Sequence, residues 1–370
     1  MTTPDDFLAQ TLIDLCRIPS PSGQEGAVAA YIRAVAADLG LTVAEDDAGP
    51  ALGSDTGNLL IRAPGVGEPL FLAAHMDTVP PTVVDGQVPV VVEGDRVHTG
   101  GRSILGADDK AGVAVGLGML RRAVRQPERT RPLEVIFTVQ EEQGARGARH
   151  FDPARITARY GYNLDGDTPV AVAIREAPHK SRFYIDVQGK AAHAALNPAD
   201  GINAVQGIAA IAAALPTGQI DADTVANVGR IEGGGATNIV PDRARLIGEV
   251  RSLRRERLDA LQAEIEATAH RQGAARGVAV TVTWEPLYGG YFVADDTACV
   301  EAFLRACRAE GLAGSLVRTY GGGDANAFNS KGMPCIVFGL GMQRIHTPEE
   351  SILLSDLARA ARILARIVGV

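Results

Sequence analysis

Residues 70–77 read Leu-Phe-Leu-Ala-Ala-His-Met-Asp, an apolar run that ends in an imidazole and a carboxylate. A continuous apolar run of this length is typical of a strand that is buried on both faces, as in sheets covered by helices. Open α/β sheets bind their ligands at the carboxyl ends of the strands. The stretch therefore predicts an α/β fold, with His75 and Asp77 at the edge where chemistry is expected.

The segments on either side of this strand also show the patterns of helices and buried strands. Apolar residues recur at helical spacing between Phe7 and Leu39, and an interruption at residues 19–23 divides two helices. Further elements are predicted as a helix at 110–124, strands at 133–139 and 160–164, a helix at 298–309, a strand at 335–338 and a helix from 351. Apolar strands that alternate with helices predict a central sheet with helices on its faces.

The middle of the chain follows a different order. Its pattern predicts a strand at 182–188, a helix at 202–215, strands at 225–231 and 244–250, a helix at 253–270 and a strand at 278–283. This order is the split βαβ arrangement of a small ferredoxin-like domain. We therefore expect residues 179–286 to be inserted into a first domain made of residues 1–178 and 287–370, with hinges near Pro178 and Pro286.

Composition argues against several classes of protein. The 370 residues are 46% hydrophobic, enough for a sizeable core, and the net charge of −8 disfavours nucleic acid as the main partner. The apolar segment at 208–215 is too short to span a membrane, and residues 1–6 do not resemble a signal peptide. The four cysteines lack a Cys-x-x-Cys pair, which favours buried thiols in a reducing cytoplasm over disulfides or a thiolate zinc site.

Two pairs of adjacent carboxylates stand next to predicted elements. Asp108 and Asp109 precede the helix at 110–124, where one can cap the helix and the other can bind a cation. Glu141 and Glu142 follow the strand at 133–139, where one can bind a metal while the other takes a proton from metal-bound water. A helix cap and a solvated acidic turn would explain the same pairs if each stood alone.

Two later strands end in further candidates. Asp165 follows the strand at 160–164, and His346 lies in the loop after residue 339, with Glu349 and Glu350 behind it. Each is an ordinary turn residue when taken alone. The whole set, however, places two imidazoles and three carboxylates at predicted strand ends, a mixture that suits zinc. The sequence therefore predicts a metal site, in which Asp77 is close enough to orient an imidazole.

In this order the motifs resemble a family of dinuclear zinc exopeptidases and deacylases that includes peptidase T, carnosinase, aminoacylase, acetylornithine deacetylase and succinyl-diaminopimelate desuccinylase. The motifs are His75-Met76-Asp77, Gly106-Ala107-Asp108-Asp109-Lys110, Glu141-Glu142, Asp165 and His346. The resemblance spans nearly the whole chain. It implies an α/β catalytic domain with a mixed central sheet flanked by helices, and an inserted α+β domain that serves as a lid and for dimerisation.

The resemblance implies two zinc ions per subunit, although manganese or cobalt can occupy similar ligands. Asp108 rather than Asp109 would bridge the ions, because the family's bridging Asp stands two residues before the Lys that is Lys110 here. The implied ligands are His75 and Asp165 for one ion, Glu142 and His346 for the other, and Asp108 for both.

Catalytic and substrate-binding roles follow from the same resemblance. Glu141 would be the general base that acts on a zinc-bridging water, and Asp77 would orient the first histidine ligand. Matches at residues 189–194, 235–241 and 249–251 lie in the inserted domain. There His193, often supplied by the other subunit of a dimer, would stabilise the oxyanion, while Asn238 and Arg251 would hold substrate oxygens or a terminal carboxylate.

Residues 105–112 and 150–152 most resemble the peptidase T-like members, which remove amino-terminal residues from tripeptides. The resemblance therefore implies a homodimeric hydrolase of amide bonds in small peptides. An N-acyl amino acid deacylase or a carboxypeptidase of the same family would use the same metals and base and would differ in its lid contacts. A binding protein that has lost its chemistry should lack a ligand or the base, whereas all of these residues are present.

Overall fold

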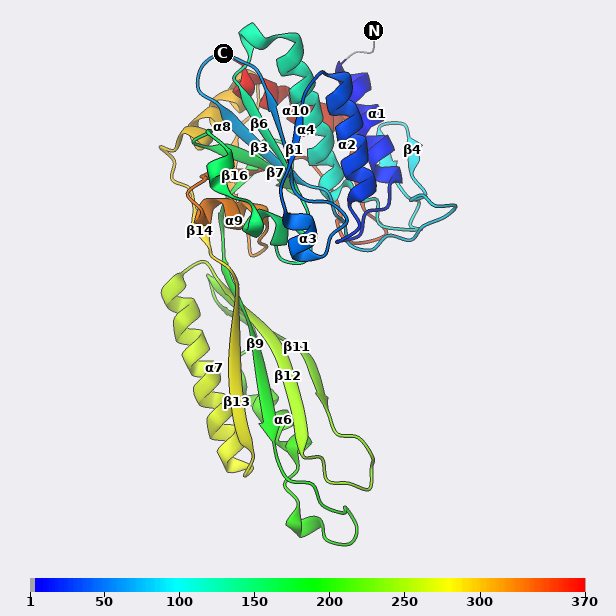
Figure 1. The fold of residues 1–370 in the computed structure, drawn as a ribbon. Helices are drawn as coiled ribbons and strands as arrows, with labels where there is room; N and C mark the ends of the chain where they lie inside the picture. The colour runs from blue at the N-terminus through cyan, green and yellow to red at the C-terminus, as the bar shows by residue number, and fades with distance from the viewer. Residues whose placement is uncertain (1–3, 370) are drawn as a thin grey trace. The chain divides into compact units, whose positions relative to one another are not determined.

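The computed structural model describes residues 4–369, and Figure 1 shows the course of the chain. Residues 1–3, part of the amino-terminal segment discussed above, lie outside the described residues. The chain divides into two compact units. The first comprises residues 1–176, 292–319 and 323–370, and the second comprises residues 177–291 and 320–322.

The first unit is built around a mixed sheet, which has nine strands among the described residues. These strands are β1 (Val43–Glu45), β2 (Leu59–Ala63), β3 (Leu70–His75), β6 (Leu133–Thr138), β7 (Gly161–Gly166), β8 (Val172–Ala177), β14 (Tyr291–Phe292), β15 (Ser315–Arg318) and β16 (Cys335–Gly339). Their order is β1-β2-β6-β3-β7-β16-β8-β14, with β15 beside β8. The central block β6-β3-β7-β16 is parallel throughout, so these strands end at one edge of the sheet.

Helices pack against this sheet, and every residue of β3 and β6 is buried as predicted for strands covered on both faces. Helix α4 (Ala107–Arg125) packs against β3 and β7, while α1 (Pro4–Arg17) and α10 (Leu354–Val368) pack against α4. Phe328 of α9 (Asp324–Ser330) meets Phe71 of β3 edge to face, with ring centroids 5.7 Å apart. The other helices are α2 (Gly26–Asp38), α3 (Ala48–Leu52), α5 (Arg146–His150), α8 (Ala298–Ala309) and the short 3-10 helices at 127–129 and 153–155.

A small sheet explains why the last helix begins later than predicted. Its three strands among the described residues are β17 (Ser351–Leu353), β5 (Arg96–His98) and β4 (Val91–Glu93), in that order. Residues 351–353 pair with β5, so α10 begins only at Leu354.

Two compositional features can be compared with the structure. All four cysteines are buried and free, which confirms the prediction of buried thiols. Within residues 4–369, no helix has the length and apolar character that crossing a membrane requires.

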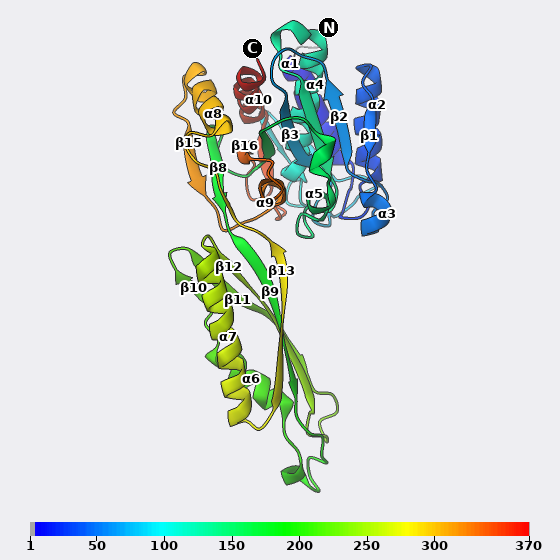
Figure 2. The ribbon, with the colours of Figure 1, turned by 60° about the vertical axis from the view of Figure 1, so that its left-hand side comes forward.

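The second unit contains an antiparallel sheet of five strands among the described residues, covered by two helices (Figure 2). Its elements are β9 (His179–Gln188), a 3-10 turn at 198–200, α6 (Ala204–Ala214), β10 (Gly218–Asp221), β11 (Thr224–Gly233), β12 (Arg243–Ser252), α7 (Arg255–Ala275) and β13 (Ala279–Tyr288). The sheet order is β10-β11-β12-β9-β13. Apart from the added edge strand β10, this is a ferredoxin-like βαββαβ arrangement, and its core includes Ile185, Ile208 and Leu246.

The predicted hinge at Pro286 is wrong. Pro286 lies inside β13 and is paired with Ser181 of β9. Strand β13 is at the edge of the sheet and its register shifts after Pro286, which are the conditions under which a strand tolerates proline. Pro178 does lie between strands, at the point where the chain passes from β8 to β9.

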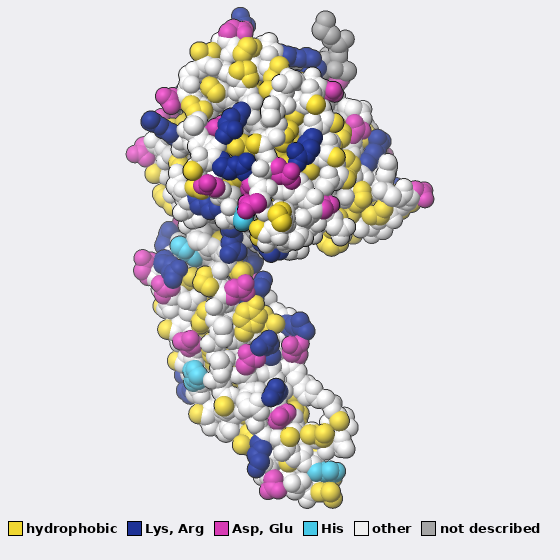
Figure 3. All heavy atoms as spheres, viewed as in Figure 1, with side chains coloured by type: hydrophobic (Ala, Val, Ile, Leu, Met, Phe, Trp, Pro, Cys, Tyr) yellow, Lys and Arg dark blue, Asp and Glu magenta, His cyan; other side chains and the backbone are white. Residues whose placement is uncertain are grey.

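Charged side chains of both signs are interspersed over the face of the second unit that Figure 3 shows. Arg245 of β12 binds Asp186 of β9 through two hydrogen bonds of 2.7 and 2.9 Å. Arg182 similarly lies 3.3 Å from Glu285 on the neighbouring strand β13. These arginines are therefore matched by acidic partners within the sheet.

Candidate active site

The parallel block of the first unit brings several of the predicted residues to one edge. His75 is the last residue of β3, the pair Glu141 and Glu142 follows β6, and Asp165 lies at the end of β7. Because β6, β3, β7 and β16 run in the same direction, these side chains and the loop after β16 meet at their carboxyl ends. Asp108 joins them from the first turn of α4, where its backbone is not helical.

Asp108 presents one carboxylate oxygen to each of two histidines. Its Oδ1 lies 3.1 Å from Nε2 of His75, and its Oδ2 lies 3.1 Å from Nε2 of His346. Two ligands bonded at about 2.0 Å to a tetrahedral zinc ion are roughly 3.3 Å apart, so these spacings suit ligands of shared ions. A carboxylate with one oxygen toward each imidazole has the geometry of a bridging ligand.

The remaining predicted ligands lie beside these two imidazoles. Glu142 Oε1 is 2.9 Å from Nε2 of His346, and Asp165 Oδ1 is 3.6 Å from Nε2 of His75. Ligand atoms of Asp108, Glu142 and His346 lie within 4.8 Å of one another. The structure thus brings all five predicted ligands together, in two groups that meet at Asp108.

Asp109 also lies in the cluster, within 4.8 Å of His75 and Asp165. Its two oxygens, however, already accept hydrogen bonds from the backbone. Oδ2 accepts from the N–H of His75 at 3.1 Å, and Oδ1 accepts from the N–H of Gly112 at 3.0 Å. Asp109 therefore ties the end of β3 to the start of α4, and the geometry favours Asp108 as the bridge.

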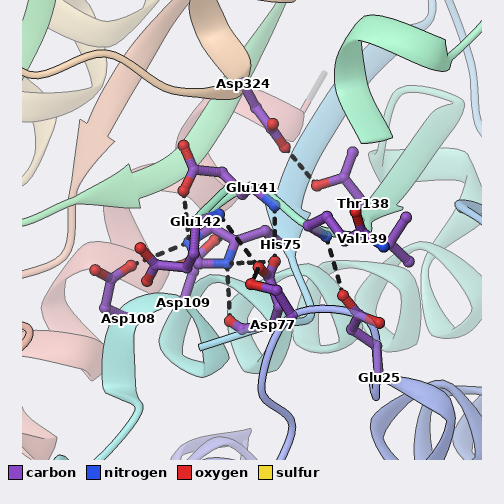
Figure 4. A network of polar contacts seen from close by, with 12 residues as sticks. Glu25, His75, Asp77, Asp108, Asp109, Thr138, Val139, Glu141, Glu142 and Asp324 are labelled. Atoms are coloured by element: carbon purple, nitrogen blue, oxygen red, sulfur yellow. Dashed lines mark hydrogen bonds and ion pairs between the residues drawn. The ribbon is translucent and has the colours of Figure 1, made fainter. Parts of the chain in front are cut away.

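Asp77 connects the first imidazole to the acidic turn (Figure 4). Its Oδ1 lies 3.4 Å from Nδ1 of His75, and its carbonyl oxygen lies 2.9 Å from the same nitrogen. These contacts direct Nε2 of His75 into the cluster, as expected for the partner of a metal ligand. The Asp77 carboxylate also accepts from the backbone N–H groups of Glu141 at 2.9 Å and Glu142 at 3.2 Å.

The carboxylates of the cluster are largely shielded from water, whereas His346 is exposed. Burial raises the pKa of Asp165 to about 7 and raises the pKa of Glu141 well above its ordinary value. The pKa of His346 is raised to about 10 by hydrogen bonds to Asp108 and Glu142. Although burial opposes it, the pKa of His75 is also raised well above its ordinary value, by Asp165 and Asp108. The neighbouring carboxylates thus favour the protonated form of both imidazoles.

The balance of charges fits divalent cations. Two imidazoles face a larger number of carboxylates, namely Asp77, Asp108, Asp109, Glu141, Glu142 and Asp165. Neighbouring buried carboxylates are stable only when cations or hydrogen bonds compensate their charge. The nearby ammonium of Lys110 donates to the carbonyl of Ile18, at 2.6 Å. The donor set therefore suits two metal ions held by oxygen and imidazole nitrogen.

Comparison with known proteins identifies the family. Residues 71–369 match Peptidase family M20/M25/M40. The chain belongs to this family. It is therefore a metallopeptidase by descent, which confirms the resemblance and the fold inferred from the motifs.

Several known proteins are similar to this M20 peptidase over nearly its whole length. The protein YqjE of Bacillus subtilis is 34% identical over 363 residues, which cover 98% of this chain and 97% of that protein. A solved structure of aminopeptidase PepT from Bacillus cereus is 33% identical with a TM-score of 0.88 and covers 98% of each chain. A tripeptidase structure from Staphylococcus aureus is 30% identical with a TM-score of 0.92 and covers 98% of this chain and 97% of that one.

Two of the three residues predicted in the inserted domain of this M20 peptidase are neighbours. His193 and Asn238 are exposed, and the N–H of Ala194 donates to the carbonyl of Asn238 at 2.9 Å. Nδ1 of His193 accepts from the N–H groups of Ala195 and Leu196, at 3.2 Å each. The ring proton is therefore on Nε2, which is available as a donor.

Arg251 lies apart from that pair. It is near the end of β12, whereas residues 189–193 adjoin the start of the same strand, since Gly189 donates to the carbonyl of Asp242. Eight residues of strand separate the two ends by roughly 25 Å. The guanidinium of Arg251 is bound by Glu249 at 2.7 Å and by the carbonyl of Tyr320 at 2.9 Å.

Two buried acids in the first unit were not assigned a role from the sequence. Glu350 accepts hydrogen bonds from the N–H groups of Leu105 and Gly106, both at 2.8 Å, and of Asp108 at 3.1 Å. It therefore ties the loop of His346 to the segment that carries the bridging carboxylate. Its sequence signal is its position four residues after that histidine.

Asp324 is the second such acid. It follows the glycine run 321–323 at the start of α9 and accepts from the hydroxyl of Thr138. Its Oδ1 has no hydrogen-bond partner within the described part of the chain. Burial raises the pKa of Asp324 to about 6. The glycine run that precedes a single acid is the signal that could have marked it.

Proposed function

We propose that this M20 peptidase is a dinuclear zinc aminopeptidase that removes the amino-terminal residue from small peptides, tripeptides above all. The observation that carries the proposal is the position of Asp108 between His75 and His346, with Glu142 and Asp165 beside them. Likeness over the whole chain to structures described as an aminopeptidase PepT and a tripeptidase supports the peptide substrate.

The proposed metal ligands are divided between two positions. His75 and Asp165 would hold one ion, Glu142 and His346 the other, and Asp108 both. Imidazole nitrogen mixed with carboxylate oxygen suits zinc, and manganese or cobalt would be the alternatives. When bound, the two ions would polarise the substrate carbonyl and make a water molecule more acidic.

Glu141 is the residue proposed to move the proton. Its Oε2 lies 4.0 Å from Nε2 of His75, so the carboxylate faces the ligand cluster without being closest to either imidazole. A raised pKa suits a group that accepts a proton from water and then returns it to the leaving amine. Asp77 would orient the His75 ring throughout, and no covalent intermediate is needed.

The second unit would act as a lid and a dimerisation domain, while the first unit carries the chemistry. The Nε2–H of His193 would donate to the oxyanion of the intermediate, and Asn238 and Arg251 would hold substrate oxygens. The distance between His193 and Arg251 within one chain fits a homodimer in which the two residues serve different active sites. Four buried free thiols support a cytoplasmic location.

The test of this proposal is a panel of peptides that differ at one end. The metal-loaded protein, and the same protein after chelation and reloading, would be assayed with tripeptides, the same tripeptides acetylated at the amine, dipeptides and N-acyl amino acids. We expect cleavage of the free-amine tripeptides, lost on chelation and restored by zinc. Cleavage of N-acyl amino acids instead would assign deacylation, and cleavage at the carboxyl end would assign a carboxypeptidase.

A further inference from the structure

The backbone that carries Glu141 is held by side chains from elsewhere in the first unit. We call residues 139–142 the catalytic turn. Each of its N–H groups donates to a side chain: residue 139 to Asn58 at 3.0 Å, residue 140 to Glu25 at 3.0 Å, and residues 141 and 142 to Asp77 at 2.9 and 3.2 Å. Figure 4 shows Glu25 and Asp77 on the side of the turn away from Asp324.

The turn has a backbone conformation that needs such support. Gln140 has a φ of 52°, in the left-handed region that residues other than glycine adopt at a cost of about 1–2 kcal/mol. Strained residues persist where the surroundings fix them. The N–H of Gln140 is bound by Glu25, and the next residue along the chain is the proposed base, so the contact acts on the direction in which Glu141 leaves the backbone.

Glu25 is built to hold this position. It is fully buried, and its Oε1 accepts from the N–H of Gly23 at 2.9 Å as well as from Gln140. Its Oε2 accepts from the hydroxyl of Ser54 at 2.6 Å. A buried carboxylate is costly unless hydrogen bonds compensate it, and here donors from three segments do so.

The segment around Glu25 also makes hydrogen bonds to residues that follow the metal ligand His75. The hydroxyl of Ser22 donates to Oδ2 of Asp77 at 2.6 Å, and the carbonyl of Ser20 accepts from the N–H of Thr78 at 2.9 Å. Residues 18–25, which connect α1 and α2, therefore hold both the segment 75–78 and the catalytic turn through hydrogen bonds.

We propose that Glu25 is a positioning residue for Glu141: its carboxylate fixes the catalytic turn through Gln140 and thereby sets the rate of proton transfer without binding metal or substrate. The inference rests on the proposed function of Glu141 as the general base. It predicts a loss in kcat with little change in KM or metal content, because four of the five proposed ligands lie outside the catalytic turn and the N–H of the fifth, Glu142, is held by Asp77.

Two substitutions test the contact at different strengths. Glu25→Ala removes every acceptor and should lower kcat by about 100-fold, the size expected when a reacting group is misplaced by roughly 1 Å. Glu25→Gln keeps one oxygen that can accept from Gln140 and Gly23, so it should restore most of kcat. Zinc content and KM should stay within about twofold of wild type in both variants.

Glu134→Ala is the matched control. Glu134 is also a buried acid of the first unit, and it accepts from the backbone N–H groups of Thr157 at 2.7 Å and Ala158 at 2.8 Å. It stands near the start of β6, at the opposite end from the catalytic turn. Its loss should reduce stability in the same way as Glu25→Ala while leaving kcat of the folded enzyme unchanged.

Hydrogen exchange provides a readout that does not depend on finding a substrate. The amides of residues 139–142 should exchange at least about tenfold faster in Glu25→Ala than in wild type, and Glu134→Ala should leave them unchanged. If Glu25→Ala does not fold, Glu25→Asp, which withdraws the carboxylate by one methylene, should show the same changes to a smaller degree.

Kinetics and exchange are measured together on wild type, the Glu25 variants and the control. Wild-type protein that cleaves no peptide would overturn the proposed function, while exchange would still decide the role of Glu25. Unchanged exchange of the catalytic turn, or a loss of activity equal in Glu25→Ala and Glu134→Ala, would overturn the positioning role. A loss explained by zinc content alone would overturn it as well.

Discussion

The carboxylate of Asp77 accepts a hydrogen bond from the backbone N–H of Glu141, over 2.9 Å. The same carboxylate lies 3.4 Å from Nδ1 of His75. One buried side chain thus fixes a proposed metal ligand and the turn of the proposed base. Asp77 therefore fixes the position of the His75 imidazole relative to the backbone of Glu141 before substrate binds.

Asp77→Asn should therefore weaken two properties at once. Asparagine offers one acceptor oxygen, so it cannot contact His75 and also accept from the backbone N–H groups of both Glu141 and Glu142. We expect metal affinity to fall by about 10–100-fold, as for other partners of metal-bound histidine, and kcat at saturating metal to fall as well. Metal titration and kinetics of the same samples measure both. Asp95→Asn is the control, because the exposed Asp95 carboxylate accepts from the N–H and the hydroxyl of Ser355; equal behaviour of the two variants would refute the link.

Gly323 leaves the space that the Glu141 carboxylate occupies. A Cβ at this position would lie 2.7 Å from Oε1 of Glu141, whereas the extended backbone, with φ of −159°, does not itself require glycine. Gly323→Ala should displace the carboxylate and lower kcat by about 100-fold with metal content retained.

The control for Gly323 is Gly118→Ala within α4. Its added Cβ would approach only Leu8, at 3.9 Å, which is an ordinary contact. Alanine in a helix should leave kcat unchanged and leave stability equal or up to about 1 kcal/mol higher. Steady-state kinetics and thermal unfolding of both variants make the comparison, and an active Gly323→Ala enzyme would contradict the assigned position of Glu141.

Glu350→Gln should loosen metal binding. The glutamate accepts from three backbone N–H groups in the segment that leads to Asp108, and a single amide oxygen cannot replace both carboxylate oxygens. We expect the metal dissociation constant to rise about tenfold or more, with kcat at saturating metal nearly kept. Competition with a chelator measures this. The neighbouring Glu349 is exposed, so Glu349→Gln should have no effect, and similar affinities for the two variants would count against Glu350.

Metal loading should release protons. The pKa of His346 is raised to about 10, so this imidazole carries a proton in the metal-free protein at pH 7.5, and nearby carboxylates shift the pKa of His75 in the same direction. Metals bind neutral imidazole, and protons therefore compete with metal. Affinity should fall as pH is lowered, and at least about one proton should leave per subunit at pH 7.5.

Calorimetry in two buffers of different ionisation enthalpy counts these protons. His346→Ala should reduce the number, whereas His270→Ala, at an exposed position of α7, should leave it unchanged. Metal binding without proton release at pH 7.5 would show that His346 is not a ligand.

The sequence predicts the centre of the fold better than its margins. Strands β3, β6, β7 and β16 appear as apolar runs because helices cover both faces of the sheet. The short strands β1, β14 and β15 carry no such pattern, since edge strands of two to four residues owe their pairing to the neighbouring strand. Pro286 was misplaced for a related reason: an edge strand can include proline.

The candidate site likewise contains residues that the sequence predicts and residues that only the structure reveals. The predicted ligands stand directly at strand ends, so local pattern and the family motifs locate them. Glu25 could not be found from local pattern, because its partner Gln140 is 115 residues away and the contact depends on how the connection between α1 and α2 folds back. Asp109 is also ambiguous until its backbone partners are seen.

The most direct test of the account compares zinc content and turnover in Glu141→Gln. Glutamine keeps the shape of the side chain and cannot accept the proton from water. We predict that the variant binds zinc as wild type does and hydrolyses tripeptides at least about 1,000-fold more slowly. Turnover near the wild-type rate with zinc in place would contradict the assignment of Glu141 as the general base.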